Sequence, residues 1–326
     1  MIEVRDMTKS FVVRQRRGGL RRTRTVVRAV DGISFTIRPG EFVGYLGPNG
    51  AGKSTTIKML TGILTPSSGS ARVAGLDPAR ERTTLARRLG VVFGQRTTLW
   101  WDLPLRDSLT LIRHLYRVEA GDHRARLAEL TELLELGPFL DTPVRQLSLG
   151  QRMRGDLTAA LLHDPPILVL DEPTIGLDVV SKATVRGFLE RLNTERGTTI
   201  LLTTHDLGDI ERLCRRIMII DHGRLAYDGD LGRLRTTIKA DRLLIVDLAA
   251  PGPEIELPGV RVLRHDGPRQ WLAIPAGVNP ATVVAGLTGR YEVADIALRE
   301  VDIEEIITRL YRSGLPASKL GDRSTL

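Results

Sequence analysis

The sequence predicts an α/β protein whose main sheet is largely parallel and carries helices on both faces. Short apolar runs of strand length alternate with stretches whose apolar residues recur at helical spacing. One run, 42–46, leads into a glycine-rich loop and a helix-like segment at 55–60, and another, 167–170, ends in two carboxylates. Such alternation favours parallel pairing, because each crossover needs a helix-length connection. Further strands are expected at 71–74, 89–93, 199–203 and 217–220.

The composition is that of a folded protein with room for one large domain and a small one. The chain has 326 residues, of which 42% are hydrophobic and 26% are charged. No apolar run approaches the roughly 20 residues of a membrane-spanning helix, and the N-terminus lacks the apolar core of a secretory signal. The single cysteine, Cys214, is typical of a reducing compartment. We therefore expect a cytoplasmic location.

Positive charge is concentrated in one segment. The formal net charge is +8, and the segment from Arg14 to Arg28 holds seven arginines and no acid, which leaves +1 for all other residues. Strand-like residues flank it at 2–8 and 26–37, so we expect the arginines on a hairpin loop. The loop is either solvated or a contact for anionic lipid headgroups or an acidic partner face. We expect no nucleic-acid partner, because the excess charge belongs to this one segment.

The glycine-rich loop matches the phosphate-binding pattern G-x-x-x-x-G-K-[ST]. A strand ending in such a loop turns backbone N–H groups toward one point, and the following helix adds its unpaired first-turn N–H groups. Lys53 supplies a charge for the β- and γ-phosphates, and Ser54 offers a hydroxyl to Mg²⁺. An ordinary glycine-rich turn is the alternative. The predicted nucleotide-binding residues here are Gly47, Pro48, Asn49, Gly50, Ala51, Gly52, Lys53, Ser54 and Thr55.

Two carboxylates, Asp171 and Glu172, follow the apolar run 167–170. In open α/β sheets ligands bind beyond the carboxyl ends of the strands. Asp171 is therefore placed to hold Mg²⁺, directly or through water, and Glu172 to polarise an attacking water. Two negative charges on a buried strand are unfavourable unless a cation or a proton offsets them. An exposed turn with two acids is the alternative interpretation.

A segment shortly before these carboxylates resembles the signature motif of ABC transporter ATPases, and it consists of Leu147, Ser148, Leu149, Gly150 and Gln151. The other motifs of that family also stand in its usual order, namely the phosphate loop, Gln95, the pair Asp171-Glu172 and His205. The resemblance covers residues 2–229. It implies a P-loop NTPase cassette, with an antiparallel β subdomain and a helical subdomain, that binds ATP and Mg²⁺ and hydrolyses ATP.

The resemblance also implies roles for single residues. Phe11 matches the aromatic residue that stacks on adenine, although a core residue of its strand is the alternative. His205 matches the switch histidine that holds the γ-phosphate and Glu172 together, and Gln95 matches the residue that links Mg²⁺ and water to the helical subdomain. The implied catalytic residues are thus Glu172, His205 and Gln95, and the implied metal ligands are Ser54, Gln95 and Asp171.

A second ATPase subunit, identical or different, is implied as a partner. The signature residues Ser148, Leu149, Gly150 and Gln151 would act on ATP held by that subunit, and Asp178 would lie in the loop joining the two sites. The family's usual signature has glycine where this chain has Leu149. A cassette that binds ATP with little turnover is therefore one alternative, and a soluble ABC ATPase acting on nucleic acid or ribosomes is another.

The runs 95–101 and 147–154 look most like cassettes of exporters whose permease is a separate chain. Trp100 and Trp101 lie where such cassettes dock the permease, unless they form the core of the helical subdomain. The resemblance thus implies a transmembrane permease partner and a peripheral place on the inner face of the cell membrane.

The domain organisation is expected to follow these motifs. Residues 1–230 would form the ATPase domain, with its helical subdomain at about 95–163 and helix breaks at Gly121 and Gly137. Residues 231–312 would form a small α+β domain, and 313–326 a disordered tail. In the small domain we expect strands at 242–248, 261–263 and 271–274 and helices at 280–287 and 302–311.

Overall fold

The computed structural model describes residues 1–16, 22–94, 96–237, 241–275 and 277–299. The chain divides into two compact units, Met1–Gly229 and Asp230–Leu326. The expected α/β fold class is confirmed. Among the described residues, no helix has both the length and the apolar character needed to cross a membrane.

The larger unit is built on a six-stranded sheet with the order β5-β6-β7-β3-β8-β9. The pairs β5–β6, β6–β7, β7–β3 and β3–β8 are parallel. Residues in the middle of this sheet are buried on both faces, which explains why their sequences are apolar without alternation. The strands are β3 (Phe42–Leu46), β5 (Leu89–Phe93), β6 (Ile167–Asp171), β7 (Thr199–Thr203), β8 (Arg216–Asp221) and β9 (Arg224–Asp230).

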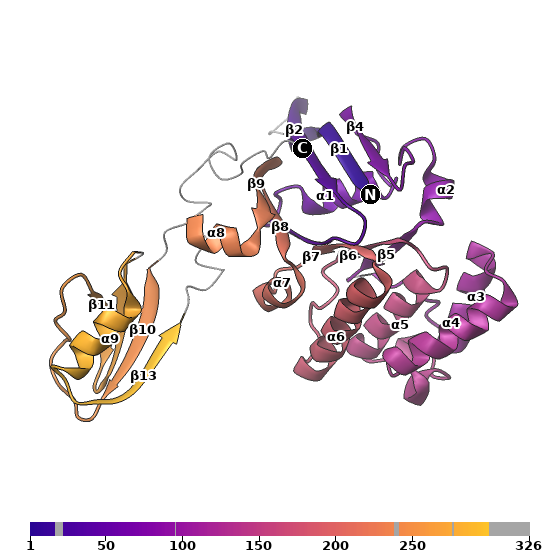
Figure 1. The fold of residues 1–326 in the computed structure, drawn as a ribbon. Coiled ribbons are helices and arrows are strands. Elements are labelled where there is room, and N and C mark those ends of the chain that lie inside the picture. Colours follow the sequence, from indigo (N-terminus) through magenta and orange to yellow (C-terminus); the bar gives the residue numbers. More distant parts are fainter. Residues whose placement is uncertain (17–21, 95, 238–240, 276, 300–326) are drawn as a thin grey trace. The chain divides into compact units, whose positions relative to one another are not determined.

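Helices and a second sheet cover this central sheet on opposite sides (Figure 1). One core joins it to helix α1 (Lys53–Leu60) and to the antiparallel sheet β2-β1-β4, through residues such as Met7, Ile33 and Met59. In Figure 1, helices α5 (Leu149–Leu161), α6 (Val179–Arg196) and α7 (Leu207–Leu213) lie on the other side. Helix α2 (Arg82–Ala86) precedes β5.

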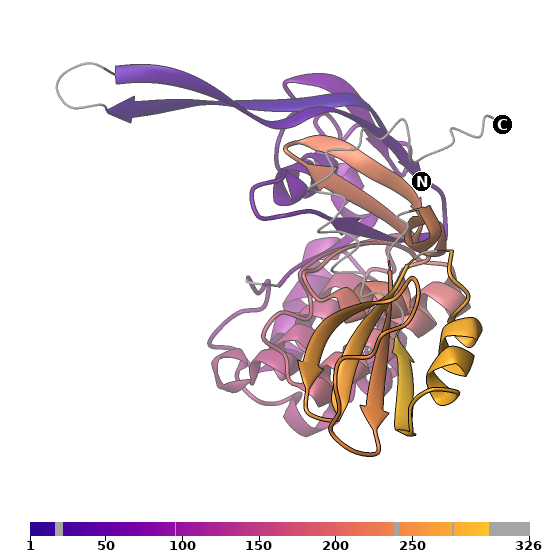
Figure 2. The same ribbon diagram turned by 90° about the vertical axis from the view of Figure 1, so that its left-hand side faces the viewer.

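The antiparallel sheet contains β1 (Ile2–Arg16), β2 (Arg22–Ile37) and β4 (Ser68–Val73). The first two continue far beyond β4 as a two-stranded ribbon, which Figure 2 shows projecting from the unit. Their pairing runs on to Arg16↔Arg22, so the expected hairpin loop is wrong for the described part of the arginine segment. The regular register beyond Lys9 extends the ladder, and interleaved valine and threonine favour strand conformation.

The helical region contains α3 (Leu105–Tyr116), α4 (Ala120–Leu133) and two 3₁₀ turns at Gly137–Phe139 and Val144–Gln146. The expected break at Gly121 is wrong, because Gly121 lies inside α4. Arg117, with a left-handed φ of 56°, ends α3 instead. Trp100 and Trp101 are 42% and 50% exposed, so the interpretation of both as core residues is wrong as well.

The smaller unit has a four-stranded sheet with the order β11-β12-β10-β13, in which neighbouring strands are antiparallel. Its core includes Leu244, Leu272 and Leu287. The strands are β10 (Arg242–Leu248), β11 (Arg261–Asp266), β12 (Arg269–Ile274) and β13 (Val293–Arg299), and the helices are α8 (Leu231–Thr237) and α9 (Pro280–Thr288). The expected helix at 302–311 and tail at 313–326 lie outside the described residues.

Candidate functional site

The phosphate-binding loop connects β3 to α1 at the carboxyl end of the central strands. Gly52 precedes the helix with φ 109°, and a Cβ there would lie 2.4 Å from the carbonyl oxygen of Ala29. A Cβ on Gly47 would lie 2.4 Å from the carbonyl oxygen of Ile220. The loop therefore fits against its neighbours only with glycine at both positions. The first-turn N–H groups of α1 follow directly, and such groups can bind an anion.

Lys53 reaches back over this loop. Its Nζ donates hydrogen bonds to the carbonyl oxygens of Gly47, at 2.6 Å, and Pro48, at 3.2 Å. Burial lowers the pKa of Lys53, while the negative charges of Glu172 and Asp171 act in the opposite direction. The loop carbonyl oxygens thus hold the ammonium group, and phosphate oxygens can replace them as its acceptors.

Thr203, at the end of β7, positions both predicted carboxylates. Its hydroxyl donates to Asp171 Oδ1 at 2.6 Å, and the backbone N–H of Glu172 donates to the Thr203 carbonyl oxygen at 2.9 Å. Glu172 has a left-handed φ of 57°. The turn after β6 therefore departs from strand geometry at the residue predicted to act on water.

His205 lies directly beside Glu172. The imidazole Nε2 is 2.7 Å from Glu172 Oε1, and the histidine is about half exposed while the glutamate is mostly buried. The next residue, Asp206, begins α7 by accepting a hydrogen bond from the N–H of Gly208. The ends of β6 and β7 thus bring a carboxylate and an imidazole into contact, and the imidazole is the more exposed of the two.

Sequence reasoning missed Thr203 and Asp209. Asp209 is fully buried on α7, where it accepts hydrogen bonds from Thr174, Thr204 and the Arg186 guanidinium. It therefore fixes the segments that follow β6 and β7. Thr203 occupies the strand position paired with Asp171, and this pairing depends on which strands are neighbours in the sheet, which the sequence alone does not give. For Asp209 the sequence offers no signal either, since a buried aspartate and an exposed one look alike in sequence.

The signature residues lie at the start of α5 and are not hydrogen-bonded to the phosphate loop among the described residues. Ser148 caps the helix: its hydroxyl accepts from the N–H of Gln151 at 3.2 Å, and Gln151 Oε1 accepts from the N–H of Ser148 at 2.9 Å. The Leu149 side chain packs beside Gly176, where a Cβ would lie 2.9 Å from Leu149 Cδ2.

The predicted dimer loop adjoins this signature. Asp178 caps α6, with its carboxylate accepting from the N–H and hydroxyl of Ser181 at 2.9 and 2.8 Å. The backbone hydrogen bond from Ser181 is the main cause that lowers the pKa of Asp178. A Cβ on Gly150 would lie 2.3 Å from Ser181 Oγ, so the two segments touch within one chain.

Phe11 and Gln95 are the two further residues that the resemblance implied for this site. Phe11 lies on the ribbon of β1 and β2, is 37% exposed, and has the Lys9 ammonium 5.4 Å from its ring centre. Its interpretation as a strand core residue is therefore wrong. Gln95 lies outside the described residues.

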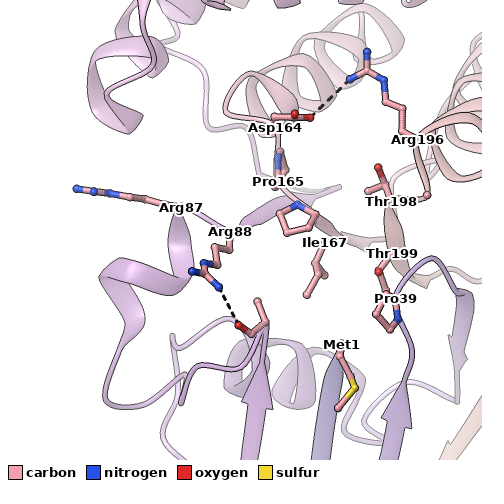
Figure 3. A pocket seen from close by; sticks show the side chains of 13 residues that line it. Met1, Pro39, Arg87, Arg88, Asp164, Pro165, Ile167, Arg196, Thr198 and Thr199 are labelled. Atoms are coloured by element: carbon pink, nitrogen blue, oxygen red, sulfur yellow. Dashed lines mark hydrogen bonds and ion pairs between the residues drawn. The ribbon is translucent and has the colours of Figure 1, made fainter.

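A cavity on the larger unit does not coincide with this site. It has a volume of about 820 Å³ and is lined by Ile167 and Thr199, the first residues of β6 and β7 (Figure 3). The carboxylates and the phosphate loop lie at the opposite ends of the strands, where ligands of open α/β sheets bind. The chemistry of the residues therefore identifies the nucleotide site better than cavity size does.

A phosphate loop, a strand-end aspartate and a glutamate held by a histidine define a P-loop nucleoside triphosphatase. Comparison with known proteins narrows this class. The model of the ABC transporter family matches residues 30–175. The chain is 34% identical over 323 residues to the daunorubicin/doxorubicin resistance ATP-binding protein DrrA of Streptomyces peucetius, covering 94% of this chain and 93% of that protein.

A second relative and a solved structure agree with this family. The chain is 42% identical over 201 residues to the Nod factor export ATP-binding protein I of Paraburkholderia xenovorans (strain LB400), covering 61% of this chain and 65% of that protein. The fold is similar to a dimeric post-hydrolysis state of the ATP-binding cassette MJ0796 bound to ADP and Pi, with a TM-score of 0.62 and 27% identity, covering 71% of this chain and 99% of that chain. The chain belongs to the ABC transporter family, as an ATP-binding subunit with ATPase activity, and the resemblance seen in its motifs is confirmed.

Proposed function

We propose that two such subunits close head to tail around two ATP molecules and that this closure drives a separate membrane permease that exports its cargo. The relatives named for drug resistance and for Nod factor export support the direction of transport. The dimeric ATP-binding cassette among the similar solved structures supports the pairing of two subunits. Hydrolysis would then reset the pair.

The Glu172–His205 contact of 2.7 Å is the observation that carries this proposal. Glu172 would accept a proton from the attacking water, and His205 would hold that carboxylate in place while its exposed edge faces the γ-phosphate. Lys53 would exchange its loop carbonyl acceptors for phosphate oxygens. These roles explain why a cation, an anion and an imidazole converge on one strand edge.

The oxygen donors at this edge fit a Mg²⁺ ion. Ser54 is exposed in the first turn of α1, and the Asp171 carboxylate accepts a hydrogen bond from Thr203. A hard cation that takes few protein ligands suits a hydroxyl and one carboxylate. Mg²⁺ would supply charge neutralisation for the phosphates. Gln95 remains the predicted third ligand.

Exposed apolar residues beside the signature support the second subunit. Val179 and Val180, directly after Asp178, are 84% and 75% exposed on the first turn of α6. Covering two exposed valines with another apolar surface removes them from water and lowers the free energy. Because Ser148 and Gly150 adjoin the same loop, one interface would bury the valines and present the signature to the partner's ATP.

The exposed Trp100 and Trp101 support docking of the permease on the helical region. Their rings offer large apolar area, and Arg152 lies 5.6 Å from the ring centre of Trp101. Aromatic and arginine residues of this kind are enriched at protein interfaces.

Glu172→Gln tests the composite site. Glutamine keeps the shape of glutamate but cannot take the proton, so uncleaved ATP should hold two subunits together. Light scattering should report a dimer with ATP and Mg²⁺ and a monomer with ADP or without nucleotide. Adding Ser148→Arg should abolish the dimer while a fluorescent ATP analogue still binds the monomer. A Glu172→Gln protein that stays monomeric with ATP, alone and with any partner cassette encoded beside it, would contradict the proposal.

A further inference from the structure

The two-stranded ribbon, here called the arm, comprises residues 10–16 and 22–28. The pairing of β1 with β4 stops at Thr8↔Ser68, whereas the pairing of β1 with β2 continues to Arg16↔Arg22. Figure 2 shows the ribbon extending away from the rest of its unit. A two-stranded ribbon alone is only marginally stable in water, so a partner that covers the arm would stabilise it.

The root of the arm exposes large apolar side chains on both of its faces. Val12 and Val26 are paired across the ladder and are each 62% exposed. Phe11 is paired with Val27 on the opposite face, and both are also exposed. Paired residues of an antiparallel ladder share a face, and successive pairs alternate. In the described part of the chain, β1 and β2 pair only with each other at these residues.

The register between β1 and β2 pairs arginine positions directly across the ladder. Arg14 pairs with Arg24 and Arg16 with Arg22, and these pairs follow Val12↔Val26 at every second position along the ladder. The backbone register therefore places the positions of a valine pair and of two arginine pairs on one side of the arm, while the intervening pairs, Val13↔Thr25 and Gln15↔Thr23, are of uncharged residue types. Like charges directly opposite each other destabilise a ladder, and an anionic surface would relieve that repulsion.

We propose that the arm binds the surface of an anionic lipid membrane through this side. Arginines near such a surface are attracted by the negative headgroups, and apolar side chains between them enter the headgroup region. The arm has no aromatic residue after Phe11 for base stacking, which disfavours single-stranded nucleic acid. Against the phosphates of a duplex the valines would gain nothing, whereas at a lipid interface they lose contact with water. The inference does not depend on the ATP-driven dimer.

Vesicle sedimentation of the full chain tests this assignment. The wild type should sediment with phosphatidylcholine vesicles that contain phosphatidylglycerol but not with phosphatidylcholine alone, and salt should weaken the binding. Changing Arg14, Arg16, Arg22 and Arg24 to Ser should reduce partition onto the vesicles by on the order of 10³-fold. Changing the same four to Lys should retain binding. The matched control removes four exposed arginines outside the arm, namely Arg38, Arg82, Arg87 and Arg124.

The double variant Val12→Ser, Val26→Ser tests the contribution of the apolar side chains separately from that of the arginines. It should weaken vesicle binding about tenfold, because the valines no longer enter the headgroup region. ATP binding and the thermal unfolding midpoint of each variant check that its fold survives. Equal binding by the wild type and the four-serine variant would overturn the proposal, and so would equal loss in the control. Tighter binding of the wild type to duplex DNA or RNA than to anionic vesicles would assign the arm to nucleic acid and likewise overturn it.

Discussion

The imidazole Nε2 of His205 and Oε1 of Glu172 lie 2.7 Å apart, although the two residues follow different strands of the central sheet. Because β6 and β7 are parallel neighbours in register at Asp171↔Thr203, their following turns meet. A rigid sheet edge therefore sets the distance between the acid and the base, and flexible loops do not.

His205→Ala should lower the ATPase kcat by roughly 10²-fold, because Glu172 loses the partner that holds it. Phosphate release measures the rate, and a fluorescent ATP analogue should bind with nearly unchanged affinity. His222→Ala is a matched control, since His222 also contacts a carboxylate at a strand end, Asp221, at 2.8 Å. A His205→Ala protein with wild-type kcat would remove the histidine from the mechanism.

Lys53→Ala should weaken ATP binding by at least about 100-fold, since two charge-assisted hydrogen bonds to phosphate are lost. In thermal unfolding, saturating ATP should then no longer raise the midpoint as it does in the wild type. Lys58→Ala, on the exposed side of the same helix, is the control and should keep the ATP-induced shift. Binding of ATP by Lys53→Ala at wild-type affinity would show that the phosphates lie elsewhere.

Leu149→Gly should restore the family's usual signature residue without raising turnover. Leu149 packs beside Gly176, so its removal should lower the free energy of unfolding by about 1–3 kcal/mol and loosen the loop that carries Asp178. In the Glu172→Gln background the ATP-bound dimer should then dissociate more readily, as measured by light scattering. Leu149→Met keeps the packing and should resemble the wild type. A rise in kcat for Leu149→Gly would mean that leucine obstructs the partner's phosphate.

His163 should make stability sensitive to acid. Its Nε2 donates to the Leu89 carbonyl oxygen at 3.0 Å, its ring stacks on Tyr116, and its Nδ1 is buried without a partner. Burial lowers the pKa of His163 below 6.5, while the Leu89 carbonyl and Asp164 act in the opposite direction. The folded histidine therefore stays neutral where the unfolded chain takes up a proton, and the free energy of unfolding falls as the pH drops below 6.5.

His163→Phe should reduce the difference between the unfolding midpoints at about pH 7.5 and about pH 5.5, because phenylalanine keeps the stacking but cannot titrate. His265→Phe, on the exposed β11–β12 hairpin, controls for the loss of an imidazole. An unchanged pH dependence in His163→Phe would show that other groups control acid unfolding.

Elements whose burial follows from composition could be predicted from the sequence. Strands at 199–203 and 242–248 have their predicted bounds, because mostly apolar runs of this length are typical of strands that bury at least one face. The arm could not be predicted, because an arginine-rich segment has the composition of a loop. Only its pairing, as a continuation of β1 and β2, shows that it is strand. The end of α3 at Arg117 was missed for a related reason: a left-handed non-glycine residue leaves no compositional signal.

The residues of the functional site also fall into those that the sequence predicts and those that it does not. Lys53, Asp171 and Glu172 are found from their motifs, because phosphate and metal chemistry restricts the residue types. Their roles in the reaction remain predictions. Thr203 and Asp209 act through hydrogen bonds whose geometry depends on which strands and helices are neighbours, and sequence spacing does not contain that information.

The left-handed backbone of Glu172 sets a conflict between robustness and activity. A residue with a Cβ in this conformation costs roughly 1–2 kcal/mol relative to glycine, and a small domain has only about 5–15 kcal/mol of net stability. Selection of variants for heat resistance alone would thus favour glycine at this position and discard the carboxylate. Thermostabilised forms of this subunit must be chosen under simultaneous selection for ATP turnover, or they will drift toward well-folded proteins that no longer work.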